Sequence, residues 1–524
     1  MSETATGIPT GIRRNHWMNQ VLTQAQMKPA STAFKFQGHV TTWSDAATQM
    51  DTIAAALQRR GVGFGDRVLM LTLNHSLVVT AVFGINRIGA IAVPMNIRLS
   101  PAELAYIIDD ADADVILVDQ PLAPLVGAAM QITSRLERVI VFGEAGEGQE
   151  SMSTLLAEPV GDFEAPDVPE DTTCLIMYTS GTTGKPKGAM LDHGNLAAQS
   201  LTVLRVNEIH DEADVSFMTA PLFHIAGLGS IAANFIVGIP TVIHPLGAFD
   251  PVALIDAWEQ EGATIVFNVP QQWQAICAVP GVRDRDLSLR VISWGAAPAS
   301  DTVLRAMSDT FPNALNVAVF GQTELSPITC ALRGEDALEK LGSVGRPIPT
   351  VQARVVDADM NDVTPGQVGE IIYRGPGLMK GYWRKPEETA AAFEGGWFHS
   401  GDLVRQDEDG FVWVVDRLKD MIISGGENVY CAEVENALFA HPDIVEAAVY
   451  GRADDRWGEV PIAALALKEG SELTLPDLQD WLEDKLAHFK QPKDIVVVEA
   501  LPRNAAGKVN KVALRAADAP VPVA

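Results

Sequence analysis

The segment YTSGTTGKPKG, residues 178–188, follows directly after the apolar run CLIM of residues 174–177. An apolar run that gives way to a polar, glycine-rich segment predicts a buried strand followed by a loop. Glycine lets a backbone adopt positive φ and approach a ligand closely. Backbone N–H groups, hydroxyls and the ammonium groups of Lys185 and Lys187 are donors that bind phosphate. The segment therefore predicts a phosphate-binding loop at a strand end, with an ordinary polar surface loop as the alternative.

This loop does not match a Walker A motif. That motif requires Ser or Thr after its Gly-Lys pair, because the hydroxyl binds magnesium. The chain has GKP at residues 184–186 and GKV at residues 507–509. The sequence thus disfavours a P-loop ATPase or kinase.

The composition is that of a globular protein with a large core, because hydrophobic residues make up 47% and charged residues 20% of the chain. With 39 Lys and Arg against 67 Asp and Glu, the net charge is −28. That charge disfavours nucleic acid and anionic membrane surfaces as general partners. An anionic substrate consequently needs a local basic site.

Cysteine usage and hydropathy bear on the cellular compartment. The four cysteines are scattered without a CxxC pair, which disfavours a disulfide framework and a metal site built on cysteine. Residues 1–11 lack the apolar core of a signal peptide, and no run of about 18 apolar residues suggests a membrane span. We therefore expect a cytoplasmic protein without a transmembrane segment, and leave peripheral membrane contact and a homodimer open.

Hydrophobic patterning predicts an α/β fold. Helical and strand-like segments alternate over residues 45–119 and again after residue 188, which favours layered helices and substantially parallel sheets. Residues 143–172 are rich in Gly, Glu, Asp and Pro and predict a loop. Short alternating segments from residue 351 predict a smaller β-rich subdomain, and a compact α+β unit is expected after residue 420. The tail after Arg515 is predicted to fray.

Residues 178–188 resemble the signature of the adenylate-forming enzymes, which include acyl- and aryl-CoA synthetases, luciferases and peptide-synthetase adenylation domains. The resemblance implies that ATP is a substrate and that this loop binds its phosphates. It also implies a catalytic and magnesium-binding role for Thr179. The phosphate-binding residues implied in this way are Thr179, Ser180, Gly181, Thr182, Thr183, Gly184 and Lys187.

Two further segments resemble the nucleotide-binding motifs of this family. FGQTE at residues 320–324 resembles its aromatic-Gly-x-Thr-Glu motif, which implies that Phe320 stacks on adenine and that Glu324 binds Mg²⁺. A carboxylate suits that role, because Mg²⁺ prefers oxygen ligands. GAAP at residues 295–298 resembles the small-residue turn beside adenine. The residues assigned to this part of the nucleotide site are Gly295, Ala296, Phe320, Gly321, Thr323 and Glu324.

Two motifs concern the ribose and the domain boundary. SGD at residues 400–402 resembles the motif whose aspartate, here Asp402, accepts hydrogen bonds from the ribose hydroxyls. DRLKD at residues 416–420 resembles the hinge motif, which implies that Arg417 contacts the ribose and that Lys419 is the pivot. We therefore divide the chain into an adenylation domain, residues 1–418, and a mobile C-terminal domain, residues 419–524.

The C-terminal domain carries two more motifs. SGGENVYCAEVE at residues 424–435 resembles a run in acyl-CoA synthetases that faces the active site during thioester formation, which implies CoA contacts at Gly425 and Gly426. Cys431 stands where the family usually has Pro, and we interpret it as a packed residue rather than a nucleophile. PRNAAGK at residues 502–508 resembles the C-terminal lysine motif and implies that Lys508 stabilises the α-phosphate during adenylation, although Ala506 replaces the common Thr.

The acyl pocket is harder to locate. PLFHIAG at residues 221–227 resembles the segment that lines or gates this pocket, which points to His224 and Gly227, with Trp294 as a further wall. A histidine among apolar residues and a Trp in an apolar strand are equally compatible with a core position.

The resemblance covers nearly the whole chain and implies an AMP-forming acyl-CoA synthetase that uses ATP, CoA and Mg²⁺. The motifs most resemble those of bacterial fatty-acyl-CoA synthetases, so medium- or long-chain fatty acids are the first expectation. The alternatives are an aryl acid of the cinnamate, coumarate or benzoate type, or a bulky sterol-derived acid. A non-enzymatic nucleotide-binding protein is the rival outside this class, although the presence of Lys508 and Glu324 disfavours it.

Overall fold

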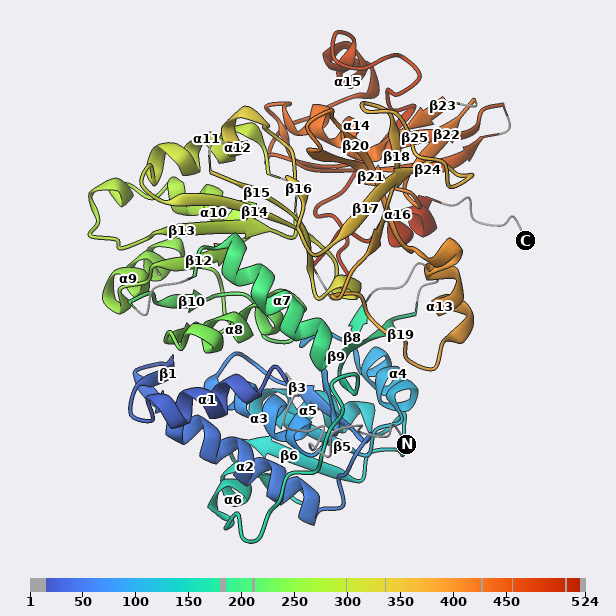
Figure 1. Cartoon of the computed structure of the whole chain (residues 1–524). Coiled ribbons are helices and arrows are strands. Elements are labelled where there is room, and N and C mark those ends of the chain that lie inside the picture. The colour runs from blue at the N-terminus through green and yellow to red at the C-terminus, as the bar shows by residue number, and fades with distance from the viewer. Residues whose placement is uncertain are drawn as a thin grey trace. The chain divides into compact units, whose positions relative to one another are not determined.

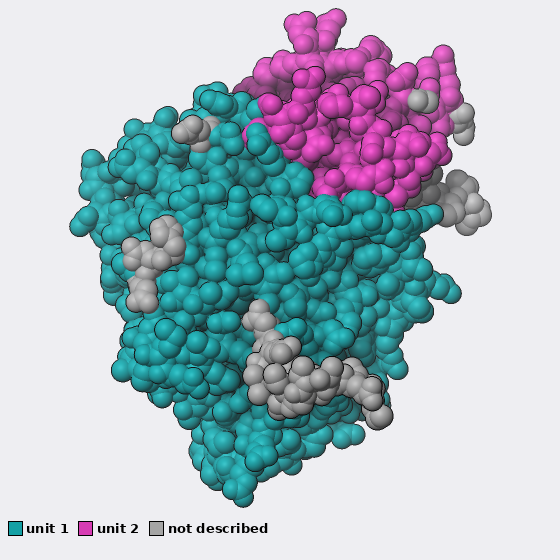
Figure 2. Space-filling view, in the orientation of Figure 1, with its two compact units in different colours: residues 1–352, 374–398 teal, residues 353–373, 399–524 magenta. Residues whose placement is uncertain are grey.

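The computed structural model describes residues 16–179, 185–209, 213–297, 299–334, 336–425, 427–454, 456–504 and 507–518. The chain forms two compact units (Figure 2). Unit 1 comprises residues 1–352 and 374–398, and unit 2 comprises residues 353–373 and 399–524. Each unit has its own sheets and its own buried core.

The longest sheet of unit 1 has the strand order β16-β15-β14-β13-β12-β10-β11-β1-β2 (Figure 1). Its central pairs, from β1 across to β14, are parallel, and both edges are antiparallel. The strands are β1 (Thr32–Phe36), β2 (His39–Thr42), β10 (Ser216–Met218), β11 (Thr241–Ile243), β12 (Ile265–Asn268), β13 (Val291–Gly295), β14 (Leu315–Gly321), β15 (Ile328–Arg333) and β16 (Arg346–Pro347).

A second sheet of unit 1 has the order β19-β9-β8-β4-β3-β5-β6-β7. Its strands β8, β4, β3, β5, β6 and β7 run parallel, whereas β9 pairs antiparallel with both β8 and β19. The strands are β3 (Arg67–Leu71), β4 (Ile91–Pro94), β5 (Val115–Asp119), β6 (Arg138–Phe142), β7 (Glu150–Ser151), β8 (Thr173–Thr179), β9 (Lys187–Asp192) and β19 (Gly381–Tyr382). Strands β3 to β5 are almost wholly buried and apolar, as expected of a parallel sheet covered on both faces.

Helices cover these sheets (Figure 1). They are α1 (Asn19–Met27), α2 (Trp43–Arg59), α3 (Ser76–Arg87), α4 (Pro101–Ala111), α5 (Ala123–Ala129), α6 (Met152–Ala157), α7 (His193–Val206), α8 (Ile225–Val237), α9 (Pro251–Glu261), α10 (Pro270–Cys277), α11 (Asp301–Thr310), α12 (Asp336–Glu339) and α13 (Pro386–Ala392). Helix α4 starts at a capping box between Ser100 and Glu103, with Pro101 in its first turn. It ends at Asp112, whose φ of 58° is left-handed. Its apolar face, which includes Leu104 and Ile108, packs in the core beside β5.

Unit 2 contains two smaller sheets. The first has the order β17-β18-β20-β21, with β17 (Gln352–Val356), β18 (Val368–Arg374), β20 (Phe398–Gln406) and β21 (Val412–Arg417). The second has the order β23-β22-β25-β24, and β26 pairs with β25. Its elements are β22 (Ile422–Ser424), β23 (Glu427–Val429), β24 (Ile444–Asp454), β25 (Gly458–Leu467), β26 (Asp494–Val497), α14 (Cys431–Phe439), α15 (Leu475–Leu482) and α16 (Lys511–Asp518).

The α/β expectation is confirmed, and two local expectations are wrong. Residues 143–172 were expected to form a loop, yet they contain β7 and α6. Met152 and Leu155 are three residues apart and both buried, so this short helix is stabilised by packing that a brief sequence pattern does not reveal. The expected fraying after Arg515 is wrong for residues 516–518, because α16 continues to Asp518, which forms an ion pair with Arg452. The rest of that tail, residues 519–524, lies outside the described residues.

The other expected boundaries remain to be tested. The predicted division at Lys419 differs from the grouping by contacts, which places the β-rich subdomain with the C-terminal segment. Among the described residues, no helix is long and apolar enough to cross a membrane.

Candidate active site

Unit 1 brings Thr179 and Glu324 together. The Thr179 hydroxyl donates to Glu324 Oε1 at 3.3 Å, and the Tyr382 hydroxyl donates to the same oxygen at 3.0 Å. Glu324 is buried, with only 7% of its surface exposed. Two hydroxyls thus lie beside one buried carboxylate, and oxygen atoms of these kinds are the ligands that a hard cation prefers.

Local structure explains why these side chains meet. Thr179 is the last residue of β8, and Glu324 lies in a 3₁₀ turn that follows β14. The Met379 amide donates to the Glu324 carbonyl at 2.8 Å, and the Ser326 hydroxyl donates to the Gly377 carbonyl at 2.8 Å. These bonds fix the turn to the segment that leads into β19 and therefore to Tyr382.

Tyr382 also contacts Lys187, one of the residues predicted to bind phosphate. The Lys187 ammonium lies 5.3 Å from the centroid of the Tyr382 ring, a cation–π distance. Burial, followed by the neighbouring Glu324 carboxylate, raises the pKa of Tyr382 well above its usual value. The hydroxyl therefore stays protonated and acts as a donor to Glu324 at neutral pH.

The phosphate loop itself is only partly described. Thr179 ends β8 and Lys187 begins β9, so the two flanks of the loop are held by neighbouring antiparallel strands. The predicted residues Ser180, Gly181, Thr182, Thr183 and Gly184 lie outside the described residues.

A cavity of about 110 Å³ lies in unit 1 beside the predicted adenine motif. Ala296, Phe320 and Gly321 line one part of it. Most of the remaining wall is apolar and comes from α7, α8, β10, β12, β14, β15 and the residues that follow α7 and precede β15. The apolar residues are Val203, Ile209, Phe217, Met218, Ala226, Ile265, Val266, Phe267, Val319, Pro327 and Ile328. The polar side chains of the wall are Asn207, Ser216, Ser230, Asn234 and Ser293.

Close packing explains the small residues beside this cavity. A Cβ atom on Gly321 would lie 1.8 Å from the Pro327 carbonyl oxygen, and one on Gly295 would lie 2.3 Å from that of Val319. Only glycine fits such approaches. Ala296 has a φ of 64°, which is uncommon for a residue with a side chain. The backbone of both predicted motifs is therefore tightly constrained.

The residues predicted for the acyl pocket lie in different surroundings. His224 precedes α8, and its ring lies 4.6 Å from that of Phe223. Gly227 is in α8, where a Cβ atom would lie 2.4 Å from the Pro221 carbonyl oxygen. Trp294 is buried, and its Nε1 donates to Asn316 Oδ1 at 2.9 Å. In β13, the preceding residue, Ser293, lines the cavity and Trp294 does not, as expected because neighbouring side chains of a strand point to opposite faces.

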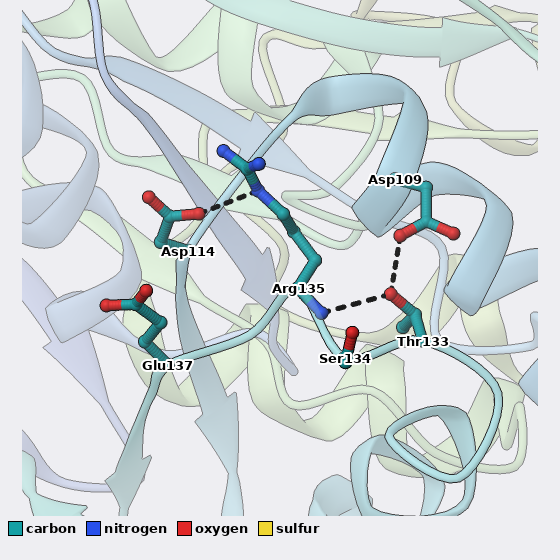
Figure 3. Close-up of a pocket in the computed structure, with 6 residues that line it drawn as sticks. All are labelled: Asp109, Asp114, Thr133, Ser134, Arg135 and Glu137. Atoms are coloured by element: carbon teal, nitrogen blue, oxygen red, sulfur yellow. Dashed lines mark hydrogen bonds and ion pairs between the residues drawn. The ribbon is translucent and has the colours of Figure 1, made fainter.

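A second pocket, of about 420 Å³, lies near the end of α4 and is strongly polar. Figure 3 shows its lining residues, in which Arg135 Nε contacts Asp114 Oδ1 at 2.8 Å and Thr133 donates to Asp109. The carboxylates of Asp109, Asp114 and Glu137 disfavour a polyphosphate here. Of the described residues predicted for the site, none lines this pocket.

Unit 2 pairs the two residues predicted for the ribose. Asp402 in β20 lies opposite Arg417 in β21, and Arg417 Nε is 2.7 Å from Asp402 Oδ1. Asp402 is buried, whereas the Arg417 side chain is 40% exposed. The guanidinium thereby offsets the cost of burying the carboxylate.

The remaining predicted residues of unit 2 lie in turns. Lys419 is exposed in the turn between β21 and β22. Gly425 has a φ of 62° at the turn between β22 and β23, and Gly426 lies outside the described residues. Lys508 is exposed, and its amide donates to Asn504 Oδ1 at 3.1 Å while its carbonyl accepts from the Asn504 amide at 2.8 Å.

Neither Tyr382 nor the polar residues of the cavity wall were predicted from the sequence. Tyr382 lies 58 residues after Glu324, and no spacing in a single sequence connects them. Asn207 and Ser293 are 86 residues apart, although the Ser293 hydroxyl donates to Asn207 Oδ1 at 2.7 Å. These contacts depend on the sheet order, which the sequence pattern does not define.

Two family models and several known proteins match the chain along most of its length. Residues 21–383 match the AMP-binding enzyme family, and residues 433–508 match the C-terminal domain of AMP-binding enzymes. The chain is 40% identical to a feruloyl-CoA synthase from Amycolatopsis sp, over 93% of this chain and 96% of that protein. It is 36% identical to an indoleacetate–CoA ligase from Aromatoleum aromaticum, over 95% and 96% of the two chains.

A solved structure is similar along the same length. The O-succinylbenzoate coenzyme A synthetase from Bacillus subtilis, in complex with ATP and magnesium ion, superposes with a TM-score of 0.84 at 30% identity, covering 95% of this chain and 98% of that one. Two family matches that together span most of the sequence, and relatives aligned over nearly all of it, establish the assignment. The chain belongs to the AMP-binding enzyme family of adenylate-forming enzymes.

Proposed function

We propose that this protein is an AMP-forming ligase that joins an aryl carboxylic acid to CoA at the expense of ATP. Its relatives are named for feruloyl, indoleacetate and succinylbenzoate substrates, all of which contain an aromatic ring. They favour the aryl-acid alternative over the fatty-acid expectation. The observation that carries the proposal for this chain is the cavity of about 110 Å³ beside the adenine motif.

The size of that cavity supports a compact acyl group. An apolar cavity of about 150 Å³ accommodates one benzene ring. The cavity at Ala296 and Phe320 is of the same order and is lined mainly by apolar side chains, which suits a single aromatic ring. A long alkyl chain or a sterol-derived group requires a considerably larger cavity.

The polar part of the wall supports a substituted ring. Asn207 and Ser293 are hydrogen-bonded to each other at 2.7 Å and both line the cavity. An amide has donors as well as an acceptor, so this pair can bind a ring hydroxyl or methoxy group in an otherwise apolar wall. A polar pair in such a wall favours substrates that form hydrogen bonds over those that do not.

The reaction has two steps. A carboxylate oxygen attacks the α-phosphorus of ATP, which forms the acyl-adenylate and releases pyrophosphate. The CoA thiol then attacks the acyl carbon, the thioester forms, and AMP leaves with the bond electrons. We assign stabilisation of the α-phosphoryl charge to Lys508, ribose binding to Asp402 and Arg417, and approach of CoA to Gly425 and Gly426.

The donor set at Glu324 fits Mg²⁺. Thr179 and Glu324 offer a hydroxyl and a carboxylate 3.3 Å apart, and Mg²⁺ typically binds one or two protein oxygens together with substrate phosphates. These two residues would hold the ion, and Tyr382 would orient the carboxylate. When bound, the ion neutralises charge on the polyphosphate.

The test is an assay of AMP and pyrophosphate release with ATP, CoA and a panel of acids. The panel pairs ferulate, coumarate, benzoate and indoleacetate with octanoate and palmitate. We expect AMP formation with the aromatic acids at a kcat/KM well above that for either aliphatic acid. A preference for palmitate would contradict the aryl assignment.

Omission of CoA serves as the control in the same assay. Without CoA, turnover should stop after a single equivalent of pyrophosphate per active site, because the acyl-adenylate is retained. Release of ADP in place of AMP, or undiminished turnover without CoA, would contradict the ligase assignment itself.

A further inference from the structure

The buried carboxylate of Asp110 lies near the C-terminus of α4, where a negative charge does not stabilise a helix. Asp110 is in the last turn of α4, where a negative charge faces the negative end of the helix dipole. Its side chain is only 8% exposed. A buried carboxylate at a helix C-terminus is unfavourable unless other groups bind it, so its partners indicate its role.

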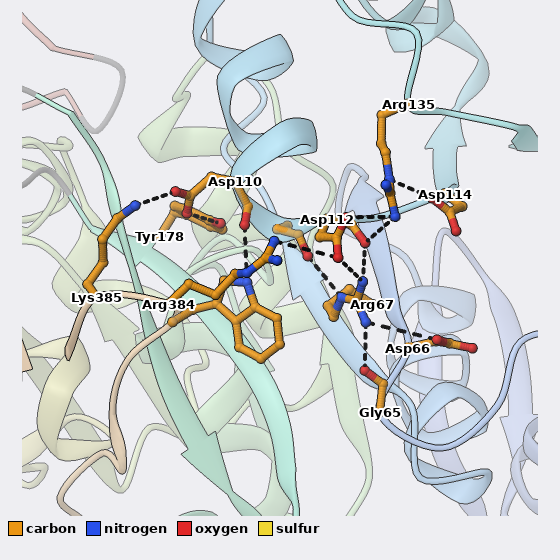
Figure 4. A network of polar contacts seen from close by, with 12 residues as sticks. Gly65, Asp66, Arg67, Asp110, Asp112, Asp114, Arg135, Tyr178, Arg384 and Lys385 are labelled. Carbon is orange, nitrogen blue, oxygen red and sulfur yellow. Dashed lines mark hydrogen bonds and ion pairs between the residues drawn. The ribbon is translucent and has the colours of Figure 1, made fainter.

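Two side chains from distant segments bind this carboxylate. The Tyr178 hydroxyl donates to Asp110 Oδ2 at 2.8 Å, and the Lys385 ammonium donates to Oδ1 at 2.6 Å. Figure 4 shows Tyr178 and Lys385 directed at Asp110 from separate parts of the unit. The Trp383 indole additionally donates to the Asp110 carbonyl at 3.1 Å.

The first of these contacts fixes one flank of the phosphate loop. Tyr178 immediately precedes Thr179 in β8, so an anchored Tyr178 ring restricts where the Thr179 hydroxyl lies. Burial, followed by the Asp110 carboxylate, raises the pKa of Tyr178 above its usual value, so the phenol remains a donor.

Helix α4 also holds the other flank of the loop. The Tyr106 hydroxyl, one turn before Asp110, lies 3.3 Å from both Asp110 Oδ1 and the Pro186 carbonyl oxygen, which share its single proton. The Lys185 ammonium lies 5.3 Å from the centroid of the Tyr106 ring. Segments on both sides of residues 180–184 are thus bound to the same face of α4.

The second contact of Asp110 reaches the Glu324 side of the site. Trp383 and Lys385 follow directly after Tyr382, and the Trp383 amide donates to the Gly188 carbonyl at 2.7 Å. Tyr382 in turn donates to Glu324. Asp110 is therefore linked to both residues assigned to the metal. Its contact with Tyr178 leads to Thr179, and its contact with Lys385 leads through Tyr382 to Glu324.

We propose that Asp110 is a positioning residue for ATP, which holds Tyr178 and Lys385 so that Thr179, Glu324 and the flanks of the phosphate loop keep their relative places. The inference rests on the proposed function, because it assumes that these residues bind Mg·ATP. Asp110 does not contact the substrate itself. It acts through residues that do.

The test is Asp110→Asn, assayed in the two half-reactions separately. The carboxamide can still accept from Tyr178 but cannot form the ion pair with Lys385. We expect kcat/KM for ATP in the acid-dependent ATP–pyrophosphate exchange to fall by about 10- to 100-fold, since small misplacements of reacting groups have effects of that size. Thioester formation from supplied acyl-adenylate and CoA should stay within about twofold of wild type, because it does not use the phosphate loop.

The matched control is Asp109→Asn, the same change at the neighbouring residue of α4. Asp109 accepts from Thr133 and has no contact with Tyr178 or Lys385 among the described contacts. It should retain wild-type values in both half-reactions. An equal loss in both half-reactions of Asp110→Asn, or no loss in either, would overturn the positioning role.

A second variant keeps the inference testable where Asp110→Asn fails to fold. Lys385→Met removes one partner, and the same split between half-reactions is expected at a smaller size. Calorimetric titration with Mg·ATP, which needs no acid substrate, should show weaker binding for both variants than for wild type and Asp109→Asn. Wild-type protein that binds Mg·ATP yet forms no AMP with any acid would refute the proposed ligase function without refuting the role of Asp110.

Discussion

The Thr179 hydroxyl donates to the Glu324 carboxylate at 3.3 Å, although 145 residues separate the two in sequence. Thr179 ends a strand of one sheet of unit 1, and Glu324 follows a strand of the other. The contact therefore lies where the carboxyl ends of strands from two sheets meet. Ligand sites of α/β proteins commonly form at such strand ends.

Glu324→Gln should separate metal-dependent chemistry from the remainder of the reaction. The amide keeps the shape and can still accept from Tyr382, but it lacks the charge that binds Mg²⁺. We expect acid-dependent ATP–pyrophosphate exchange to fall by about 10²- to 10³-fold. Titration of Mg²⁺ should show a raised requirement for the ion, and an unchanged magnesium dependence would contradict the assignment.

Lys508→Ala should affect the first half-reaction selectively. Lys508 is exposed on a loop of unit 2, and its backbone bonds with Asn504 are of a kind that alanine retains. We expect adenylation to fall by about 10²- to 10³-fold, with thioester formation from supplied acyl-adenylate largely retained. Lys485→Ala, at another exposed lysine of the same unit, is the control and should behave like wild type.

Lys419→Pro should have the opposite selectivity. Lys419 lies in the exposed turn between β21 and β22, and proline fixes φ near −65° and restricts the residue before it. We expect this stiffer turn to slow the thioester half-reaction more than adenylation. Stopped-flow measurement of each half-reaction checks the expectation, and unchanged thioester rates would argue against Lys419 as the pivot.

Cys431 should be chemically inert in the native protein. The residue is fully buried, and burial raises the pKa of its thiol to about 12. The thiolate is the reactive form, so the fraction available at pH 8 is very small and should increase only as the pH rises toward that pKa. We expect no iodoacetamide adduct at Cys431 by mass spectrometry at pH 8, in contrast to urea-unfolded protein. Rapid native labelling would reopen a nucleophilic role.

Secondary-structure elements could be predicted from the sequence, whereas the contacts between residues far apart in it could not. The alternation of helices and strands over residues 45–119 and the α+β unit after residue 420 were predicted, because each element has its own hydrophobic period. The contacts of Asp110 with Tyr178 and Lys385 were not, because they join residues 68 and 275 positions apart. Short elements such as α6, whose stability comes from packing rather than propensity, were missed for the same reason.

Asn207→Leu should change which acid is preferred. Asn207 Oδ1 accepts from Ser293 at 2.7 Å within the cavity wall, and leucine replaces the amide with an apolar group of similar size. A lost hydrogen bond to a substrate hydroxyl corresponds to about 0.5–1.5 kcal/mol, or up to about tenfold in kcat/KM. In kcat/KM, coumarate should therefore lose about 2- to 10-fold relative to cinnamate, which has no ring hydroxyl, while KM for ATP stays unchanged. Asn316→Leu, which breaks the bond to Trp294 on the opposite face of the sheet, is the control for general loss of packing. An equal decrease in kcat/KM for coumarate and cinnamate would show that Asn207 stabilises the cavity wall but does not bind the ring hydroxyl.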